Sequence, residues 1–206
     1  GAGKVYAAAR AGQTIAVPDG RVVPVILDIT DQGQVDAAAA ICGDVTLLIN
    51  NAGVNFNSGL LAAPSIDNAR LEIETNYLGT LRMCRAFAPI LGRNGGGCIV
   101  NMISILALVH LPLMGSLCAS KAALWSLTQG VRAELAKQGT LVVGVLPGAV
   151  ETRMTEGVPV PKIRPRAGPH GSLARGPAGR SGRQRSGHGW PALAISIRPA
   201  ATSMDA

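Results

Sequence analysis

Short apolar segments that alternate with helical segments are the feature that most constrains the fold of this 206-residue chain. Continuous apolar runs such as VTLLI are typical of strands that are covered on both faces, as in parallel sheets. Five segments have this character: Lys4–Ala9 and residues 22–27, 45–49, 98–103 and 141–146. Strands separated by helices predict an α/β fold with a parallel sheet and right-handed crossover connections.

Three segments between these runs are predicted to be helices. Gln32–Ile41 is rich in alanine, and Thr30 or Asp31 is positioned to cap its first turn. Residues 66–91 carry large apolar side chains at helical spacing, and residues 116–137 form a second long amphipathic segment. With strands on either side, these helices complete the repeating pattern of an α/β domain.

The net charge of +7 is confined to one end of the chain. Residues 1–158 are neutral overall, whereas residues 159–206 hold the whole basic excess and are rich in Gly and Pro. Such a composition is typical of a segment without a packed core. We therefore expect a domain over residues 1–157 and an irregular, disordered basic tail over residues 158–206. The split excludes a uniformly basic nucleic-acid-binding domain.

The cysteines and the apolar stretches exclude other classes of protein. Four cysteines lie far apart with no CxxC pair, which predicts reduced thiols, no metal site and a cytoplasmic location. Residues 94–120 contain no charged side chain and are long enough to span a bilayer, but glycines, Asn101, His110 and Pro112 interrupt them. We expect neither a signal peptide nor a membrane span.

Several short motifs, taken in order, resemble those of the short-chain dehydrogenase/reductase family. They are Asn50-Asn51-Ala52-Gly53, Asn76, Ser104, Lys121, and Pro147-Gly148 followed by Thr152. Each is weak alone, but their order and spacing agree with the family over residues 1–156. The resemblance implies a Rossmann-like doubly wound sheet that binds NADP or NAD. It also implies hydride transfer between nicotinamide and a small-molecule carbonyl or alcohol substrate.

The resemblance assigns catalytic roles to residues of this chain. In the family, a Tyr four residues before the Lys transfers a proton, and the Lys lowers the pKa of that phenol. Lys121 would also hold the nicotinamide ribose, Ser104 would bind the substrate oxygen, and Asn76 would order a water beside Lys121. Positions 117 and 121 share one face of a helix, as this arrangement requires. Without family membership, Ser104 reads as a strand-end serine and Lys121 as a surface lysine.

The chain departs from the family at the proton-transfer position, which is Leu117. Leucine cannot transfer a proton, and general acid–base catalysis typically contributes about 10²–10⁴ in rate. Cys118 lies about 100° further around the helix, which makes it a poor replacement. His110, in the loop on the substrate side, is another conceivable stand-in. We expect impaired activity.

A second departure lies at the start of the sequence. The family's first strand and its Gly-rich loop cradle the cofactor pyrophosphate on a helix N-terminus. This sequence begins after that point, and Gly1-Ala2-Gly3 reads as the turn before the strand Lys4–Ala9. In the family the missing strand is central, between Lys4–Ala9 and residues 45–49. We therefore expect a truncated copy whose sheet has unpaired inner edges.

Further cofactor contacts are implied at the strand ends. Arg10 matches a position where a basic side chain meets the 2′-phosphate of NADP, and Asp28 matches an adenine-contacting acid. A solvated strand-end arginine and a turn or capping aspartate are the competing interpretations. The backbone of Asn51, Ala52 and Gly53 would pass the cofactor. The implied set is completed by Lys121, Pro147, Gly148 and Thr152.

Three functions follow for comparison. The leading one is an NAD(P)-dependent oxidoreductase of the short-chain type, impaired in this copy. The alternative is a non-catalytic Rossmann-fold protein that binds or dimerises through residues 66–91 and 116–137. Nucleic-acid binding by the tail is disfavoured, because the segment has no RGG repeats and a single aromatic residue, Trp190. A shifted reading frame is a further account of the tail composition.

Overall fold

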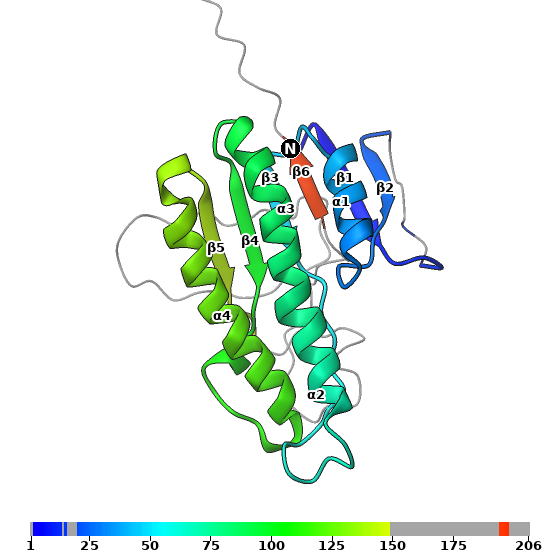
Figure 1. Cartoon of the computed structure of the whole chain (residues 1–206), viewed down its shortest axis with the longest axis vertical. Coiled ribbons are helices and arrows are strands. Elements are labelled where there is room, and N and C mark those ends of the chain that lie inside the picture. Colours follow the sequence, from blue (N-terminus) through cyan, green and yellow to red (C-terminus); the bar gives the residue numbers. More distant parts are fainter. Residues whose placement is uncertain (1, 14, 16–19, 149–193, 198–206) are drawn as a thin grey trace, which may run out of the picture.

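A six-stranded sheet forms the centre of the computed structural model, which describes residues 2–13, 15, 20–148 and 194–197. The strand order is β2-β1-β6-β3-β4-β5 (Figure 1). The strands are β1 Lys4–Ala9, β2 Val22–Ile26, β3 Leu47–Asn50, β4 Cys98–Met102, β5 Leu141–Val145 and β6 Ala194–Ile197. The pairs β1–β2, β3–β4 and β4–β5 are parallel, so their carboxyl ends lie at one edge of the sheet.

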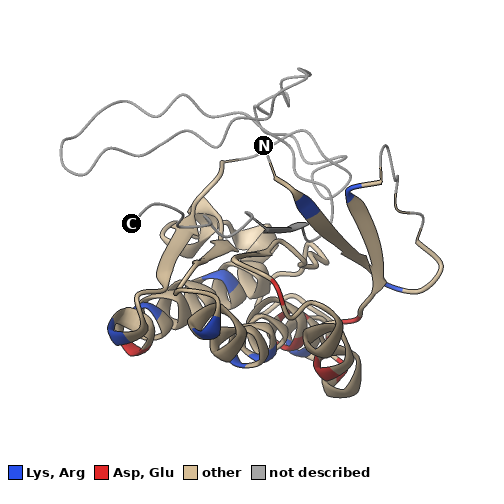
Figure 2. Ribbon diagram, turned by 90° about the horizontal axis from the view of Figure 1, so that it is seen from above, with Lys and Arg blue, Asp and Glu red and all other residues tan. Residues whose placement is uncertain are grey.

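The long helices pack against one face of this sheet. They are α1 Gln32–Ile41, α3 Thr80–Arg93 and α4 Gly115–Leu135, and all three lie below the strands in Figure 2. The short helix α2 Asp67–Glu72 continues through a π-helical segment, Ile73–Gly79, into α3. Most of the charged residues belong to this helical layer rather than to the strands (Figure 2). A second helical layer, which a doubly wound sheet implies, is not seen in the described part of the chain.

The structure confirms the Rossmann-like α/β fold. All five predicted strands are present, and α1 has the predicted bounds, with the Asp31 side chain accepting a 3.0 Å hydrogen bond from the Gln34 amide. The single helix predicted over residues 66–91 is instead α2, the π-helical segment and α3. The predicted basic tail, residues 158–206, lies outside the described residues except for β6.

Apolar side chains between the sheet and the helices make the core. Leu48 of β3, Ile99 of β4 and Val142 of β5 are fully buried against Phe87 of α3 and Leu124 of α4. Burial of such a side chain contributes about 1.5–3 kcal/mol. This layer fixes the helices beneath the strand ends and so fixes the residues that project from them.

A tight turn joins α3 to β4. Gly97 has φ +63°, and a Cβ there would lie 2.4 Å from the Thr46 carbonyl oxygen, so only glycine fits. Asn94 closes the same turn, because its Nδ2 donates to the carbonyls of Gly43 (3.0 Å) and Val45 (2.9 Å). The turn sets β4 beside β3 in parallel register.

The predicted gap in the sheet is filled, so the expectation of unpaired inner edges is wrong. The strand β6 lies antiparallel between β1 and β3. Its pairing extends from Lys4 to Ala7 on β1 but covers only Leu47 and Leu48 on β3. Residues 192–197 (ALAISI) are apolar, but nothing local in the sequence indicates that they pair with segments so distant in the chain.

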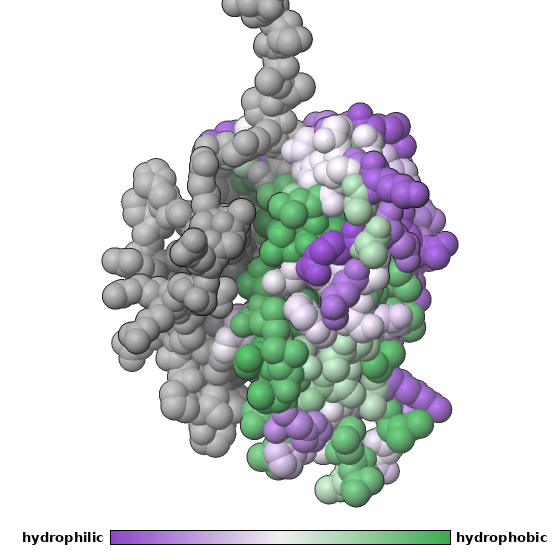
Figure 3. Space-filling view, turned by 90° about the vertical axis from the view of Figure 1, so that its left-hand side faces the viewer, coloured by the Kyte–Doolittle hydropathy of each residue, from purple (hydrophilic) through white to green (hydrophobic). Residues whose placement is uncertain are grey.

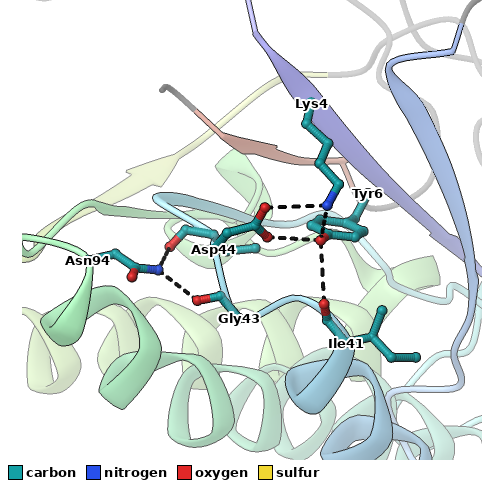
Figure 4. Close-up of polar contacts among 7 residues, drawn as sticks. Lys4, Tyr6, Ile41, Gly43, Asp44 and Asn94 are labelled. Atoms are coloured by element: carbon teal, nitrogen blue, oxygen red, sulfur yellow. Dashed lines mark hydrogen bonds and ion pairs between the residues drawn. The ribbon is translucent and has the colours of Figure 1, made fainter. Parts of the chain in front are cut away.

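A polar cluster ties β1 to the segment before β3 (Figure 4). The Tyr6 hydroxyl donates to Asp44 Oδ1 at 2.8 Å, and Lys4 Nζ contacts both Tyr6 and Asp44 Oδ2. Burial raises the pKa of Tyr6, and although burial also opposes ionisation of Asp44, hydrogen bonds from Tyr6 and Lys4 lower its pKa. These contacts hold the two sides of the sheet together independently of β6.

Candidate active site

The carboxyl ends of the parallel strands carry a buried polar network. Asn50 Nδ2 donates to Asn101 Oδ1 at 2.9 Å, and Asn101 Nδ2 donates to Thr128 Oγ1 at 3.0 Å. All three side chains are buried. Because buried amides need partners, this chain of contacts fixes the ends of β3 and β4 against α4. The residues that follow these strands are thereby held in place.

Lys121 lies two turns into α4 and points at the end of β4. Its Nζ donates to the Met102 carbonyl at 3.0 Å, and the residue is 8% exposed. Burial disfavours the charged form and lowers the pKa of Lys121 to about 8. The amine therefore titrates near pH 8. Lys121 is not an exposed surface lysine, so the competing interpretation is wrong.

Asn76 belongs to the π-helical segment and is fully buried. Its Oδ1 accepts from the Val54 amide at 2.8 Å, while Nδ2 donates to the Val54 carbonyl (3.0 Å) and to Ser120 Oγ (2.9 Å). A Cβ on Gly53 would lie 3.0 Å from Asn76 Oδ1 and 3.6 Å from Lys121 Nζ. Three predicted site residues, from three separate motifs, thus converge.

Ser104 follows β4 and begins a short 3₁₀ turn, Ile105–Ala107. Its Oγ accepts from the Leu106 amide at 3.2 Å, and the residue is half-buried. The Ile105 amide donates to the Pro147 carbonyl at 3.0 Å, which brings the segment after β4 beside the segment after β5. Ser104 and Pro147 therefore lie at the same edge of the sheet as Lys121.

Leu117 is buried in the first turn of α4, one helical turn before Lys121. It is 5% exposed and packs with Met114, Cys118 and Leu106 in a small apolar cluster. Its carbonyl accepts a 2.8 Å hydrogen bond from Ser120 Oγ. The side chain thus places a hydrocarbon surface where the family's tyrosine would be.

Neither sequence-level stand-in takes the place of that tyrosine. His110 is exposed in the loop between β4 and α4. Cys118 is 4% exposed, and its thiol accepts a 3.5 Å hydrogen bond from the Leu111 amide, so it faces that loop. Among the described residues, neither side chain is hydrogen-bonded to Lys121 or Asn76.

Arg10 and Asp28 line one open cleft of about 480 Å³ after the ends of β1 and β2, together with Ala11, Gly12, Gln13 and Gln34. Asp28 Oδ1 accepts from the Thr30 amide (2.9 Å) and hydroxyl (2.7 Å). Burial acts to raise the pKa of Asp28, but these bonds and the charge of Arg10 lower it. The carboxylate stays ionised beside an exposed guanidinium.

The other predicted residues are partly accounted for. Asn51, Ala52 and Gly53 are half-buried after β3, and Gly148 is exposed at the end of the described segment. Thr152 lies outside the described residues. Pro147 and Gly53 are therefore brought to the Lys121 site, whereas Arg10 and Asp28 form a separate cleft along the same edge.

The sequence analysis did not identify three residues that contribute to these sites. Ser120 bridges Asn76 and Leu117, and Glu72 Oε1 accepts from the Phe56 amide at 2.8 Å. Gln34 Oε1 accepts from the Asp28 amide at 2.8 Å. The spacing Asp31-x-x-Gln34 is that of a capping box and was an available signal for Gln34. Glu72, four residues before Asn76, shares its helical face.

Two exclusions apply to the described part of the chain. No group of His, Cys, Asp and Glu side chains there is arranged to hold a metal ion. No helix there has the length and apolar character needed to cross a bilayer. The thiols of Cys42, Cys84, Cys98 and Cys118 are free.

Comparison with known families gives a match to the short chain dehydrogenase family over residues 4–161. The chain belongs to the short-chain dehydrogenase family. The match spans every site residue named above, including those of the separate Arg10 cleft.

Curated relatives cover a range of activities. The chain is 34% identical over 142 residues to 2-(R)-hydroxypropyl-CoM dehydrogenase of Xanthobacter autotrophicus, aligning 66% of this chain with 57% of the relative. It is 32% identical over 168 residues to the 3-oxoacyl-[acyl-carrier-protein] reductase FabG of Thermotoga maritima, aligning 80% with 65%. The chain therefore spans less than two thirds of these relatives.

Solved structures agree with this assignment. A short chain dehydrogenase from Burkholderia cenocepacia J2315 in complex with NADP is 52% identical, with a TM-score of 0.77 over 80% of this chain and 69% of that one. A gluconate 5-dehydrogenase of the same organism, in complex with NADP and tartrate, is 28% identical, with a TM-score of 0.63 over 66% and 55%.

Proposed function

We propose that this chain is the NADP-binding part of an oxidoreductase that interconverts a carbonyl and an alcohol by hydride transfer, and that Leu117 impairs its turnover. The observation that carries the proposal is the convergence of Gly53, Asn76 and Lys121 at the end of β4, with Leu117 one helical turn away. Family membership supports the reaction class, and the buried leucine supports the impairment.

The residues present fit a dinucleotide with a 2′-phosphate. Arg10 offers an exposed guanidinium to that phosphate, and the ionised Asp28 offers an acceptor to the adenine amine. The glycine at position 53 allows backbone to pass close to Asn76 and Lys121. When bound, NADP supplies or accepts the hydride. NADP in the solved relatives with 52% and 28% identity is consistent with this preference over NAD.

The chain's own residues would orient the substrate but not protonate it. Ser104 would donate to the substrate oxygen, and Lys121 would hold the ribose. Although burial lowers its pKa to about 8, the Lys121 amine is still mostly protonated at pH 7 and would keep positive charge nearby. Asn76 would fix the loop at Val54 and a water beside Lys121. A proton must still reach the alkoxide oxygen, and Leu117 has none to give.

The test separates cofactor binding from turnover. NADPH is titrated into the full chain and followed by nicotinamide fluorescence, and NADPH oxidation is then measured with a panel of ketones. We expect saturable binding that weakens in Arg10→Ala, with little oxidation. Leu117→Tyr should exceed the matched Leu117→Phe by the contribution of one acid group, about 10²–10⁴-fold. Wild-type turnover equal to that of Leu117→Tyr would overturn the impairment.

A homodimer through residues 66–91 and 116–137 is a second element of the proposal. Among the described residues, the first of these segments exposes two large apolar side chains, Ile66 and Leu71, which such an interface would bury. Light scattering of the full chain tests it, since a strictly monomeric species would contradict it.

A further inference from the structure

Two loops beside the candidate site carry large apolar side chains on the surface. One loop, residues 53–66, leads into α2, and the other, residues 103–114, leads from β4 into α4. We call the exposed set the apolar rim, and it consists of Leu60, Leu61, Leu108, Val109, Leu111 and Leu113. Leu61 is 99% exposed and Leu113 is 76% exposed. Folded domains expose contiguous apolar surface chiefly where it binds something.

The two loops pack together into one surface. The Ser116 amide and hydroxyl donate to the Ser58 carbonyl at 3.4 and 3.3 Å. A Cβ on Gly115 would lie 2.6 Å from Leu60 Cγ, and one on Gly59 would lie 3.3 Å from the Pro112 carbonyl. In Figure 3, apolar surface extends down this face to the lower end of the molecule, where Figure 1 places both loops.

The apolar rim is continuous with the candidate site. Ile105, itself 39% exposed, directly follows Ser104. Leu106 then packs on the cluster of Met114, Leu117 and Cys118 at the start of α4. A molecule held at Ser104 would therefore meet hydrocarbon on the side of the second loop.

The two loops that carry the apolar rim contain no charged side chain. Residues 53–66 and 94–120 contain no Asp, Glu, Lys or Arg, and His110 is the one imidazole in either segment. Lys121 is buried, belongs to neither loop, and donates to the Met102 carbonyl. A substrate carboxylate or phosphate lying on this surface would lose water without gaining a cationic partner from either loop, which is costly. An alkyl chain would instead gain from burial.

We infer that the substrate is an uncharged carbonyl or alcohol compound whose apolar chain lies on the apolar rim. The inference rests on the proposed function, because it takes Ser104 as the position of the substrate oxygen. It adds a substrate class, and it predicts that keto acids and phosphorylated sugars bind less well to this surface than uncharged compounds do.

The first experiment measures binding of straight-chain methyl ketones, from hexanone to decanone, to the full chain. Methyl NMR of labelled leucine and valine reports the affinity and the site, with and without NADPH. We expect affinity to rise with length by up to about fourfold per added methylene, with shifts at the apolar rim. A decanone analogue with a terminal carboxylate should bind more weakly by about tenfold or more. Equal affinity for both decanones would overturn the inference.

Charge variants supply the matched control. Leu61→Asp and Leu113→Asp should each weaken decanone binding by about tenfold, because they place a carboxylate where the alkyl chain of the ketone lies. Leu141→Asp, also at an exposed leucine (61%) but at the amino end of β5, should not. Unchanged binding in both rim variants, or a changed oligomeric state with unchanged ketone affinity, would contradict the inference.

The outcomes also separate this inference from the proposed function. NADPH binding without length-dependent ketone binding would overturn the substrate class and leave the cofactor role standing. Ketone binding at the apolar rim without NADPH binding would overturn the cofactor role and leave the substrate class standing. Failure of both ligands would overturn both.

Discussion

Replacing Lys121 by methionine tests how strongly burial acts on the candidate site. The pKa of Lys121 falls from 10.5 to about 8 because the amine is desolvated. Each tenfold change in proton affinity corresponds to about 1.4 kcal/mol, so the folded state holds this proton less favourably by about 3 kcal/mol. Methionine has similar length without charge, but it loses the bond to the Met102 carbonyl, worth about 1 kcal/mol. At pH 7 we expect Lys121→Met to raise the free energy of unfolding by about 2 kcal/mol.

The pH dependence gives the sharper signature. Between about pH 8 and 10.5, the unfolded chain still binds the proton that folded Lys121 has released, so the wild-type protein gains stability from this group as pH rises. The advantage of Lys121→Met should therefore shrink and vanish near pH 10, to within about 1 kcal/mol. Burial raises the pKa values of Cys42 and Cys84 to about 11 and about 12, which acts in the opposite direction. That contribution is present in both proteins and cancels in their difference.

Urea unfolding at pH 7, 8.5 and 10, followed by far-UV circular dichroism, measures this difference. Lys137→Met is the matched control, because Lys137 is exposed and should show no such pH-dependent gain. A Lys121→Met protein that is less stable than wild type at pH 7, or whose advantage is constant from pH 7 to 10, would refute the reasoning.

Three further substitutions test the fold by the same unfolding assay. Gly97→Ala should cost more than about 3 kcal/mol, because φ is +63° and the Cβ would lie 2.4 Å from backbone. Gly139→Ala, with φ +74° but open space around it, should cost only about 1–2 kcal/mol, and equal losses would contradict the steric argument. Asn76→Ala should cost about 3 kcal/mol, since it leaves both polar backbone groups of Val54 and the Ser120 hydroxyl without their partner; a loss under about 1 kcal/mol would show that water replaces it.

The strands were predictable because the residues of each strand show by themselves that the segment is buried. A continuous apolar run such as residues 45–49 must be covered on both faces wherever it lies, so its strand identity does not depend on the partner. The long helix over residues 66–91 was less tractable. The π-helical segment that interrupts it contains Asn76, whose side chain contacts Val54 and Ser120. The spacing of apolar residues along a helix does not predict such contacts. A Cβ on Gly79 would also lie 2.7 Å from Ile29, a tertiary approach invisible in the pattern.

The candidate site was predictable in composition but not in electrostatics. Resemblance indicated Lys121 and Asn76, and helical geometry put Lys121 on one face with position 117. The lowered pKa of Lys121 arises from its burial at the end of β4, where it contacts Met102. That burial depends on how the sheet and α4 pack. The partnership of Arg10 with Asp28 likewise needed β1 and β2 to be placed side by side.

The strand β6 has a consequence for the order in which the protein folds. It pairs Lys4 with Ile197, so the backbone hydrogen bonds that unite the two halves of the sheet span almost the whole chain. Contacts between such distant residues carry a large loop-closure entropy and form slowly. During synthesis, β1 and β3 must therefore wait until residues 194–197 have left the ribosome. Until then, the Lys4–Tyr6–Asp44 cluster is the cross-link available to hold these strands at the right separation. A nascent chain halted before residue 194 should accordingly engage chaperones that recognise open strand edges.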